Sequence, residues 1–114
     1  PLVLNFGRPE KTRRKRRRIP LEVGVPLDEI VLLPNNGRYV NELEIQISVP
    51  DMNGNRSETS IDKIPINGGA PPRPGPLMYY ETDLLLVAKD HRIVVAVFDP
   101  LSGTILSRST ELSP

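Results

Sequence analysis

The chain has 114 residues, of which 38% are hydrophobic and 25% charged, and this length fits a single domain. The absence of cysteine excludes disulfides, cysteine-based metal sites and cysteine nucleophiles. No uncharged run approaches the roughly 18 apolar residues of a membrane-spanning helix, and no signal sequence opens the chain. We therefore expect a soluble, mature single domain covering residues 1–114.

Apolar and polar residues alternate along much of the chain, which is the period of a strand with one buried face. Leu43–Val49 alternates without a break, and the continuous apolar runs 84–88 and 93–98 are typical of strands inside a sandwich. No helical stripe is sustained over three turns, and 13 prolines oppose long helices. The predicted strands are 2–6, 17–25, 29–33, 39–49, 57–66, 78–88, 92–99 and 104–109.

Turn signals separate these strands at the spacing of an all-β sandwich. Pro34–Gly37 predicts a turn, and Asn53–Gly54 predicts a tight hairpin because both residues accept positive φ. The short connection Lys89–His91 predicts that the runs 84–88 and 93–98 pair as a hairpin. Asp99–Gly103 predicts the turn into the last strand.

Residues 67–76 form a segment rich in proline and glycine. Such residues neither continue a strand ladder nor begin a helix, so we predict a long crossover loop, extended where it is rich in proline. Pro71 and Pro74 also form a Pro-x-x-Pro pair beside Arg73, which is a weak signal for a ligand of an SH3-type domain.

These elements predict an all-β fold, a two-sheet immunoglobulin-like or fibronectin-III-like β-sandwich of about seven to eight antiparallel strands. Inward-facing aliphatic side chains on the predicted strands should form its core. The predicted core consists of Leu21, Val23, Leu32, Leu43, Ile45, Ile47, Val49, Ile64, Leu84, Leu86, Ile93, Val95, Val97 and Ile105.

The net charge of +1 hides an uneven distribution. Residues 1–18 hold eight Lys or Arg and one Glu, a net charge of +7, so the rest of the chain carries −6. The candidate anion-binding residues are Lys11, Arg13, Arg14, Lys15, Arg16, Arg17 and Arg18. They fit three readings: a solvated turn followed by arginines on the outer face of a strand, a site for a polyanion or an anionic membrane surface, or a targeting signal. No aromatic residue accompanies the run to stack a base, which makes nucleic acid the less favoured polyanion.

Other motifs give little support for catalysis or metal binding. Asp51, Asn53 and Asn55 have the first spacings of a calcium-binding EF-hand loop, but Arg56 occupies the position that requires glycine. His91, the only histidine, follows Asp90 in a predicted turn, which favours a solvated residue over a general base. We therefore predict a protein that is not an enzyme and that has no metal, cofactor or catalytic residues.

Three segments together resemble a known family. They are Arg18–Ile30 with its following Leu-Leu-Pro turn, Gly37–Val40 continuing through Leu43–Val49 to Asp51–Ser57, and Arg92–Phe98 continuing into Asp99–Gly103. In this order they are similar to the C-terminal portion of bacterial proteins that carry a von Willebrand factor A related domain. The resemblance covers most of residues 17–109.

The resemblance implies an immunoglobulin-like sandwich that forms part of a larger exported protein, secreted, periplasmic or on the cell surface. The Asp-x-Ser-x-Ser adhesion motif of the A domain does not occur in this chain, so metal-dependent adhesion is not implied. The expected function is that of an accessory or protein–protein interaction module. Its expected partners are neighbouring domains, another protein, or a second copy joined through edge strands.

Overall fold

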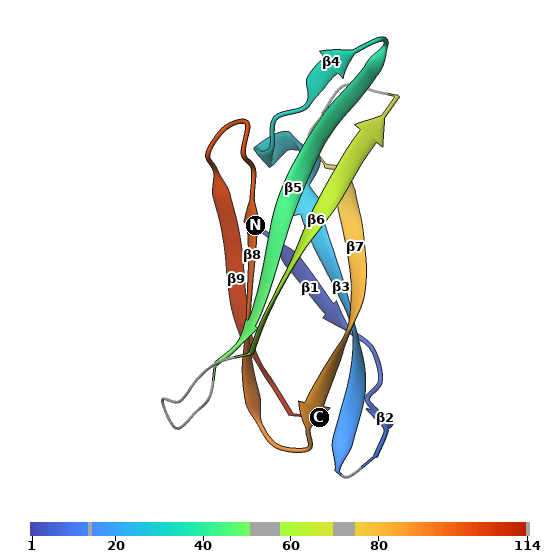
Figure 1. Cartoon of the computed structure of the whole chain (residues 1–114), viewed down its shortest axis with the longest axis vertical. Helices are drawn as coiled ribbons and strands as arrows, with labels where there is room; N and C mark the ends of the chain where they lie inside the picture. The colour runs from blue at the N-terminus through green and yellow to red at the C-terminus, as the bar shows by residue number, and fades with distance from the viewer. Residues whose placement is uncertain (14, 51–57, 70–74, 114) are drawn as a thin grey trace.

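The alternating segments form two antiparallel sheets (Figure 1) in the computed structural model, which describes residues 1–13, 15–50, 58–69 and 75–113. Sheet A contains β1 (Val3–Phe6), β2 (Glu10–Lys11), β3 (Arg16–Pro26) and β7 (Leu77–Val87). Sheet B contains β4 (Leu33–Asn35), β5 (Arg38–Val49), β6 (Glu58–Gly68), β8 (His91–Phe98) and β9 (Ile105–Leu112). The all-β sandwich is confirmed, with nine strands in the described residues.

Each sheet is organised around one long central strand. β3 pairs with β7 along its whole length on one side and with β1 and β2 on the other. β5 likewise pairs with β6 along one side and with β4 and β8 on the other, and β9 lies outside β8. The order β1–β3–β7 in one sheet opposite β6–β5–β8–β9 in the other is that of a two-sheet antiparallel β-sandwich.

Alternate residues of the central strands face inward and form one continuous core. Eleven of the predicted core residues are buried, and Leu32 and Val49 pack partly buried against them. Leu2, Ile19, Val25 and Ile30 are also buried, although the sequence prediction omitted them. Ile105 was predicted wrongly: its side chain is 65% exposed, because its pairing with Phe98 puts it on the outer face of sheet B.

The predicted hairpin between residues 84–88 and 93–98 does not form. β7 pairs with β3 in sheet A, whereas β8 pairs with β5 and β9 in sheet B. The short connection therefore carries the chain from one sheet to the other. In this arrangement Leu84 and Leu86 from β7 and Ile93 from β8 are buried in the same core cluster. The two runs meet there from opposite sheets, as in a fold of two packed layers.

The predicted strand 29–33 is also wrong. A short 3₁₀ turn, η1 (Leu27–Glu29), follows β3, and the strand β4 begins only at Leu33. The N–H of Val31 donates a hydrogen bond to the Asp99 side chain at 2.8 Å, a partner outside any ladder. The carbonyl of Val31 also accepts a hydrogen bond from the Asn41 amide at 2.8 Å. Ile30 is buried, so this segment is held by one apolar anchor and two side-chain hydrogen bonds rather than by strand pairing.

The turns follow their residue chemistry where the structure describes them. Asn36 and Gly37, at φ of 51° and 77°, join β4 to β5, as a two-residue hairpin with two positive φ angles requires. β5 and β6 pair as predicted, but the Asn53–Gly54 turn lies outside the described residues. The segment rich in proline and glycine lies between β6 in sheet B and β7 in sheet A, but its first two residues, 67 and 68, belong to β6 and not to a loop, and residues 70–74 are not described.

Polar side chains link the two sheets at their edges. The Tyr80 hydroxyl on β7 donates to Asp62 on β6 at 2.8 Å, and burial, followed by this contact with the Asp62 carboxylate, raises the pKa of Tyr80. Arg108 on β9 donates to the carbonyl of Leu2, just before β1, at 2.9 Å. β7 therefore lies beside β6 at one side of the sandwich, and the start of the chain lies beside β9 at the other.

We predict that truncation of two isoleucines changes the free energy of unfolding by very different amounts. Ile45→Ala removes a side chain that is 1% exposed and should lower the free energy of unfolding by about 2–5 kcal/mol, because a cavity remains. Ile105→Ala, at 65% exposure, should change it by no more than about 0.5 kcal/mol. Urea denaturation of both variants measures this, and equal losses would contradict the inward and outward assignment of β5 and β9.

Candidate functional site

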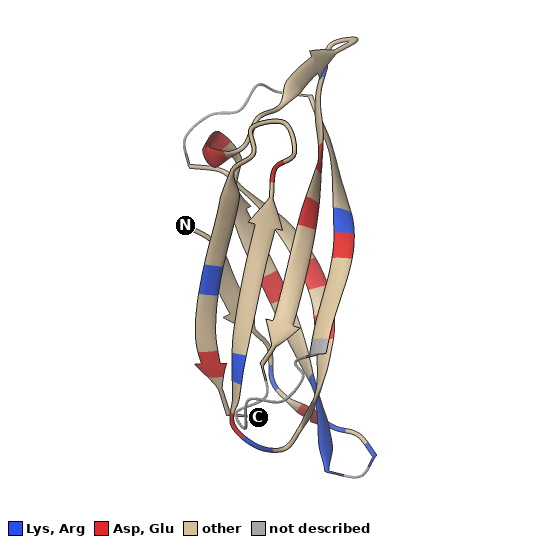
Figure 2. Ribbon diagram, turned by 60° about the vertical axis from the view of Figure 1, so that its left-hand side comes forward, with Lys and Arg blue, Asp and Glu red and all other residues tan. Residues whose placement is uncertain are grey.

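The described residues of the basic run form a hairpin at one end of sheet A, which we call the basic hairpin (residues 10–13 and 15–18). Lys11 of β2 pairs with Arg17 of β3, and Lys15 adopts φ of 60° in the intervening turn. Lys11, Arg13, Lys15, Arg16 and Arg18 are exposed, and Arg17 is half-buried with its guanidinium donating to the carbonyl of Arg16 at 3.1 Å. Figure 2 shows basic residues gathered at this end of the molecule.

Arg16 and Arg18 lie on the outer face of sheet A beyond the turn, whereas Lys11, which the solvated-turn reading placed in the turn, belongs to β2. Arg14 lies outside the described residues. One basic residue that the sequence reasoning missed joins the hairpin. The N–H of Ala88 donates to the carbonyl of Lys15 at 2.8 Å, which brings the following Lys89 to the same end. The pairing of β3 with β7 is the only signal that could have found it.

Two exposed aliphatic side chains lie directly beside the hairpin arginines. In the register of β3 and β7, Arg18 stands opposite Leu85 and Arg16 opposite Val87. Leu85 is 48% exposed and Val87 is 44% exposed. Opposite residues of antiparallel strands share a face, so the outer end of sheet A combines positive charge with apolar surface.

Acidic residues near the basic hairpin leave most of its charge uncompensated. Glu10 stands opposite Arg18 in the register of β2 and β3. The Asp90 side chain accepts a hydrogen bond from the hydroxyl of Ser113 at 2.8 Å. Neither carboxylate forms an ion pair within 4.0 Å of a basic group of the described hairpin residues.

The outer face of sheet B has the opposite character, because its centre carries no charge. Phe98 and Ile105 stand side by side across β8 and β9, and Ile61 on β6 is 61% exposed. The central outward positions, which we call the uncharged face, are Gln46, Ser48, Thr59, Ile61, Val94, Ala96, Phe98, Ile105, Ser107 and Ser109.

Charged residues lie at both ends of the uncharged face. Glu42 and Lys63 form an ion pair at 3.7 Å at one end, beside Glu44. Arg92 stands opposite Glu111 at the other end. In Figure 2 the strands of sheet B lie in front. Arg92, near the start of β8, is the one Lys or Arg of that strand. A charge-free centre with a charged rim is the usual composition of a protein-binding surface.

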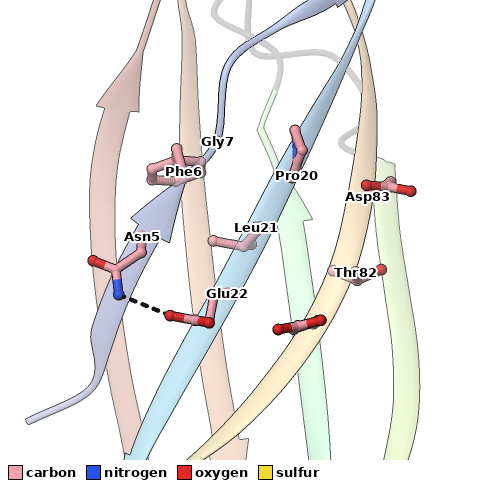
Figure 3. Close-up of a pocket in the computed structure, with 9 residues that line it drawn as sticks. Asn5, Phe6, Gly7, Pro20, Leu21, Glu22, Thr82 and Asp83 are labelled. Atoms are coloured by element: carbon pink, nitrogen blue, oxygen red, sulfur yellow. Dashed lines mark hydrogen bonds between the residues drawn. The ribbon is translucent and has the colours of Figure 1, made fainter.

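A hollow of about 500 Å³ lies on sheet A between β1, β3 and β7 (Figure 3). Its lining brings together Glu22, Glu81 and Asp83, and Asn5 donates to Glu22 at 3.1 Å. Glu22 stands directly opposite Glu81 on the neighbouring strand. Two like charges in this position repel each other and destabilise the strand pair. Within the described residues, no group of three His, Asp or Glu side chains is placed to hold a metal ion.

Asp99 is the most buried ionisable residue described, with 1% of its surface exposed. Its carboxylate accepts hydrogen bonds from the N–H of Val31 at 2.8 Å, and from Asn41, Leu101 and Ser102 at 2.9 Å each. Burial by itself raises the pKa of Asp99, but these four donors outweigh it and lower the pKa below 3.8. The carboxylate thus joins the β8–β9 turn to β5 and to the segment after η1.

His91 and Ser102 both have structural partners. The His91 ring lies at the start of β8, with Nε2 2.9 Å from the carbonyl oxygen of Val87. Ser102 belongs to the Asp99 turn, where Gly103 takes φ of 78° and its N–H donates to the carbonyl of Asp99. The calcium-like spacing of Asp51, Asn53 and Asn55 lies outside the described residues.

No family model, curated protein or solved structure matches the chain. In the part of the chain that the structure describes, no helix has the length and apolar character needed to cross a membrane.

We predict that Asp99→Asn destabilises the protein by about 2 kcal/mol at pH 7, because a neutral amide leaves buried donors without an acceptor. The lowered pKa means that Asp99 stabilises the fold fully above 3.8 and loses this effect as the pH falls through its folded-state pKa. The difference between wild type and variant should consequently narrow below about pH 4. Urea denaturation across pH measures both trends, and a constant difference would contradict the role given to the ionised carboxylate.

Proposed function

We propose that the chain is a non-enzymatic, immunoglobulin-like interaction module of an exported bacterial protein, and that it binds through the uncharged face of sheet B. The observation that carries this proposal is the absence of charge from ten central outward positions, among which Phe98 and Ile105 are exposed. Protein interfaces are depleted of charge at their centre and enriched in aromatic side chains. The matching partner surface is apolar and uncharged, on a neighbouring domain or another protein.

The uncharged face is smaller than a standard protein–protein interface. Standard interfaces contain about 20–30 residues on each side. The ten positions and their charged rim are fewer, so we propose a small and reversible contact rather than an obligate one. The polar rim, including the Glu42–Lys63 pair, would orient the partner more than it would strengthen binding.

The geometry of the polar groups supports a role without catalysis. The carboxylate of Asp99 is engaged by four donors, and the His91 ring contacts a backbone carbonyl. Placement in a secreted, periplasmic or cell-surface protein rests on the resemblance of residues 17–109 to the C-terminal portion of von Willebrand factor A related proteins.

Site-specific photo-crosslinking in bacteria that produce the natural protein tests the binding face. A benzophenone amino acid in place of Ala96 should give a discrete protein adduct, whereas the same group in place of Glu81 on sheet A should not. Mass spectrometry identifies the partner in the adduct. The purified partner should bind the wild-type chain, and its affinity for the Val94→Lys variant should be at least about tenfold lower.

Phe98→Ala provides the second variant, because truncating an aromatic residue at an interface commonly costs tenfold or more in affinity. Thermal unfolding of both variants controls for folding, since neither side chain is fully buried. Equal adducts from positions 96 and 81, or none from position 96, would overturn the proposal.

A further inference from the structure

We propose that the outer end of sheet A, formed by the basic hairpin and the end of β7, docks on an anionic lipid surface. The proposal concerns a different face from the uncharged face of sheet B and does not depend on it. Its basis is the placement of exposed arginines and exposed aliphatic side chains in one register.

The docking surface is defined by four outward residues and the turns beside them. Arg16 and Arg18 on β3 stand opposite Val87 and Leu85 on β7, so charge and apolar area alternate over the same patch. Lys15 and Lys89 lie in the two adjacent turns, joined by the hydrogen bond from Ala88 to the Lys15 carbonyl. Lys11 and Arg13 extend the positive charge along the hairpin.

Each component matches one layer of an anionic bilayer. Lys and Arg near such a surface each raise affinity about fivefold by attraction to the headgroups. Leu85 and Val87 are close to half exposed, and removing aliphatic area from water into the acyl boundary adds a further favourable contribution. The side chains of arginine can reach the phosphates while their stems lie along the apolar layer.

The same features distinguish lipid from nucleic acid. A nucleic-acid site gains from aromatic side chains that stack on bases, and neither residues 10–18 nor residues 85–89 contain an aromatic. Phosphates of a nucleic-acid backbone offer nothing to Leu85 and Val87, which a lipid surface would cover. The acidic groups beside this surface are Glu10, Asp90 and Asp83, the last facing outward on β7 two residues before Leu85. They are fewer than the basic groups and weaken the attraction without reversing it.

Co-sedimentation with vesicles tests the proposal. The protein should bind phosphatidylcholine vesicles containing about 30% phosphatidylglycerol and should not bind phosphatidylcholine alone, with binding falling as salt rises. Arg16→Ser with Arg18→Ser should weaken binding about thirtyfold, and Leu85→Ser with Val87→Ser at least about tenfold.

Matched controls lie on sheet B. Ile61→Ser with Ile105→Ser removes two aliphatic side chains of greater exposure, and Lys63→Ser removes a basic residue paired with Glu42. Both controls should change vesicle binding by no more than about twofold, because these positions face away from the lipid in the proposed orientation.

A tryptophan reporter provides a measurement independent of affinity, because the chain contains no tryptophan. The emission of Val87→Trp should shift to shorter wavelength with phosphatidylglycerol vesicles, and that of Ile105→Trp should not. Unchanged emission from Val87→Trp on bound protein would show that the apolar side chains stay in water and would overturn the proposal.

Two further outcomes would also overturn it. One is the absence of vesicle binding by wild type. The other is tight binding to a DNA duplex that is lost in the arginine variant but unaffected in the Leu85 and Val87 variant, which would identify a nucleic-acid site instead. Photo-crosslinking at position 96 reports separately on sheet B, so failure here leaves the proposed protein-binding face standing.

Discussion

The structure depends on the burial of two apolar runs that are close in sequence but lie in different sheets. β7 and β8 are separated by only a short connection, yet each pairs with a different central strand. If they paired with each other, one sheet would gain both runs and the other would lose a partner for its central strand. Sending one run to each sheet lets Leu84, Leu86, Ile93 and Val95 meet in one core, as two packed layers require.

The same division creates two outer faces with different chemistry. The partner of β7 is β3, whose first residues are arginines, so the exposed side chains of β7 join the basic hairpin. The partners of β8 are β5 and β9, where Gln46, Ser48, Ser107 and Ser109 face outward, so Ala96 and Phe98 join the uncharged face. Because these surfaces belong to opposite layers, the protein-binding and lipid-docking roles proposed for them are compatible in one molecule.

Strand positions and most of the core could be predicted from residue alternation alone. Leu43–Val49 alternates cleanly, and its odd-numbered residues are buried as expected, apart from the partly buried Val49. The prediction that Ile105 is buried was wrong because a short strand with few apolar residues does not indicate which of its faces is inward. The pairing of β9 with β8 decides this. The predicted strand 29–33 was wrong because its apolar residues resemble those of a strand. The backbone N–H of Val31 donates to the distant Asp99 carboxylate and not to a neighbouring strand.

Sheet membership could not be read from the sequence, because a short polar connection fits both a hairpin and a crossing between layers. Consequently the basic run was identified from composition, but its neighbours Lys89, Leu85 and Val87 were not. The uncharged face was missed for the same reason, since its residues come from four separate strands and share a surface only after pairing.

The pairing of β7 with β3 and of β8 with β5 is therefore the claim that everything else rests on, and interstrand nuclear Overhauser effects measure it directly. Backbone contacts should join Ile19 to Leu84 and Ile45 to Val97, along the β3–β7 and β5–β8 ladders. A ladder of backbone contacts between residues 84–88 and 93–98 would show the hairpin instead and would contradict both the fold and the two surfaces derived from it.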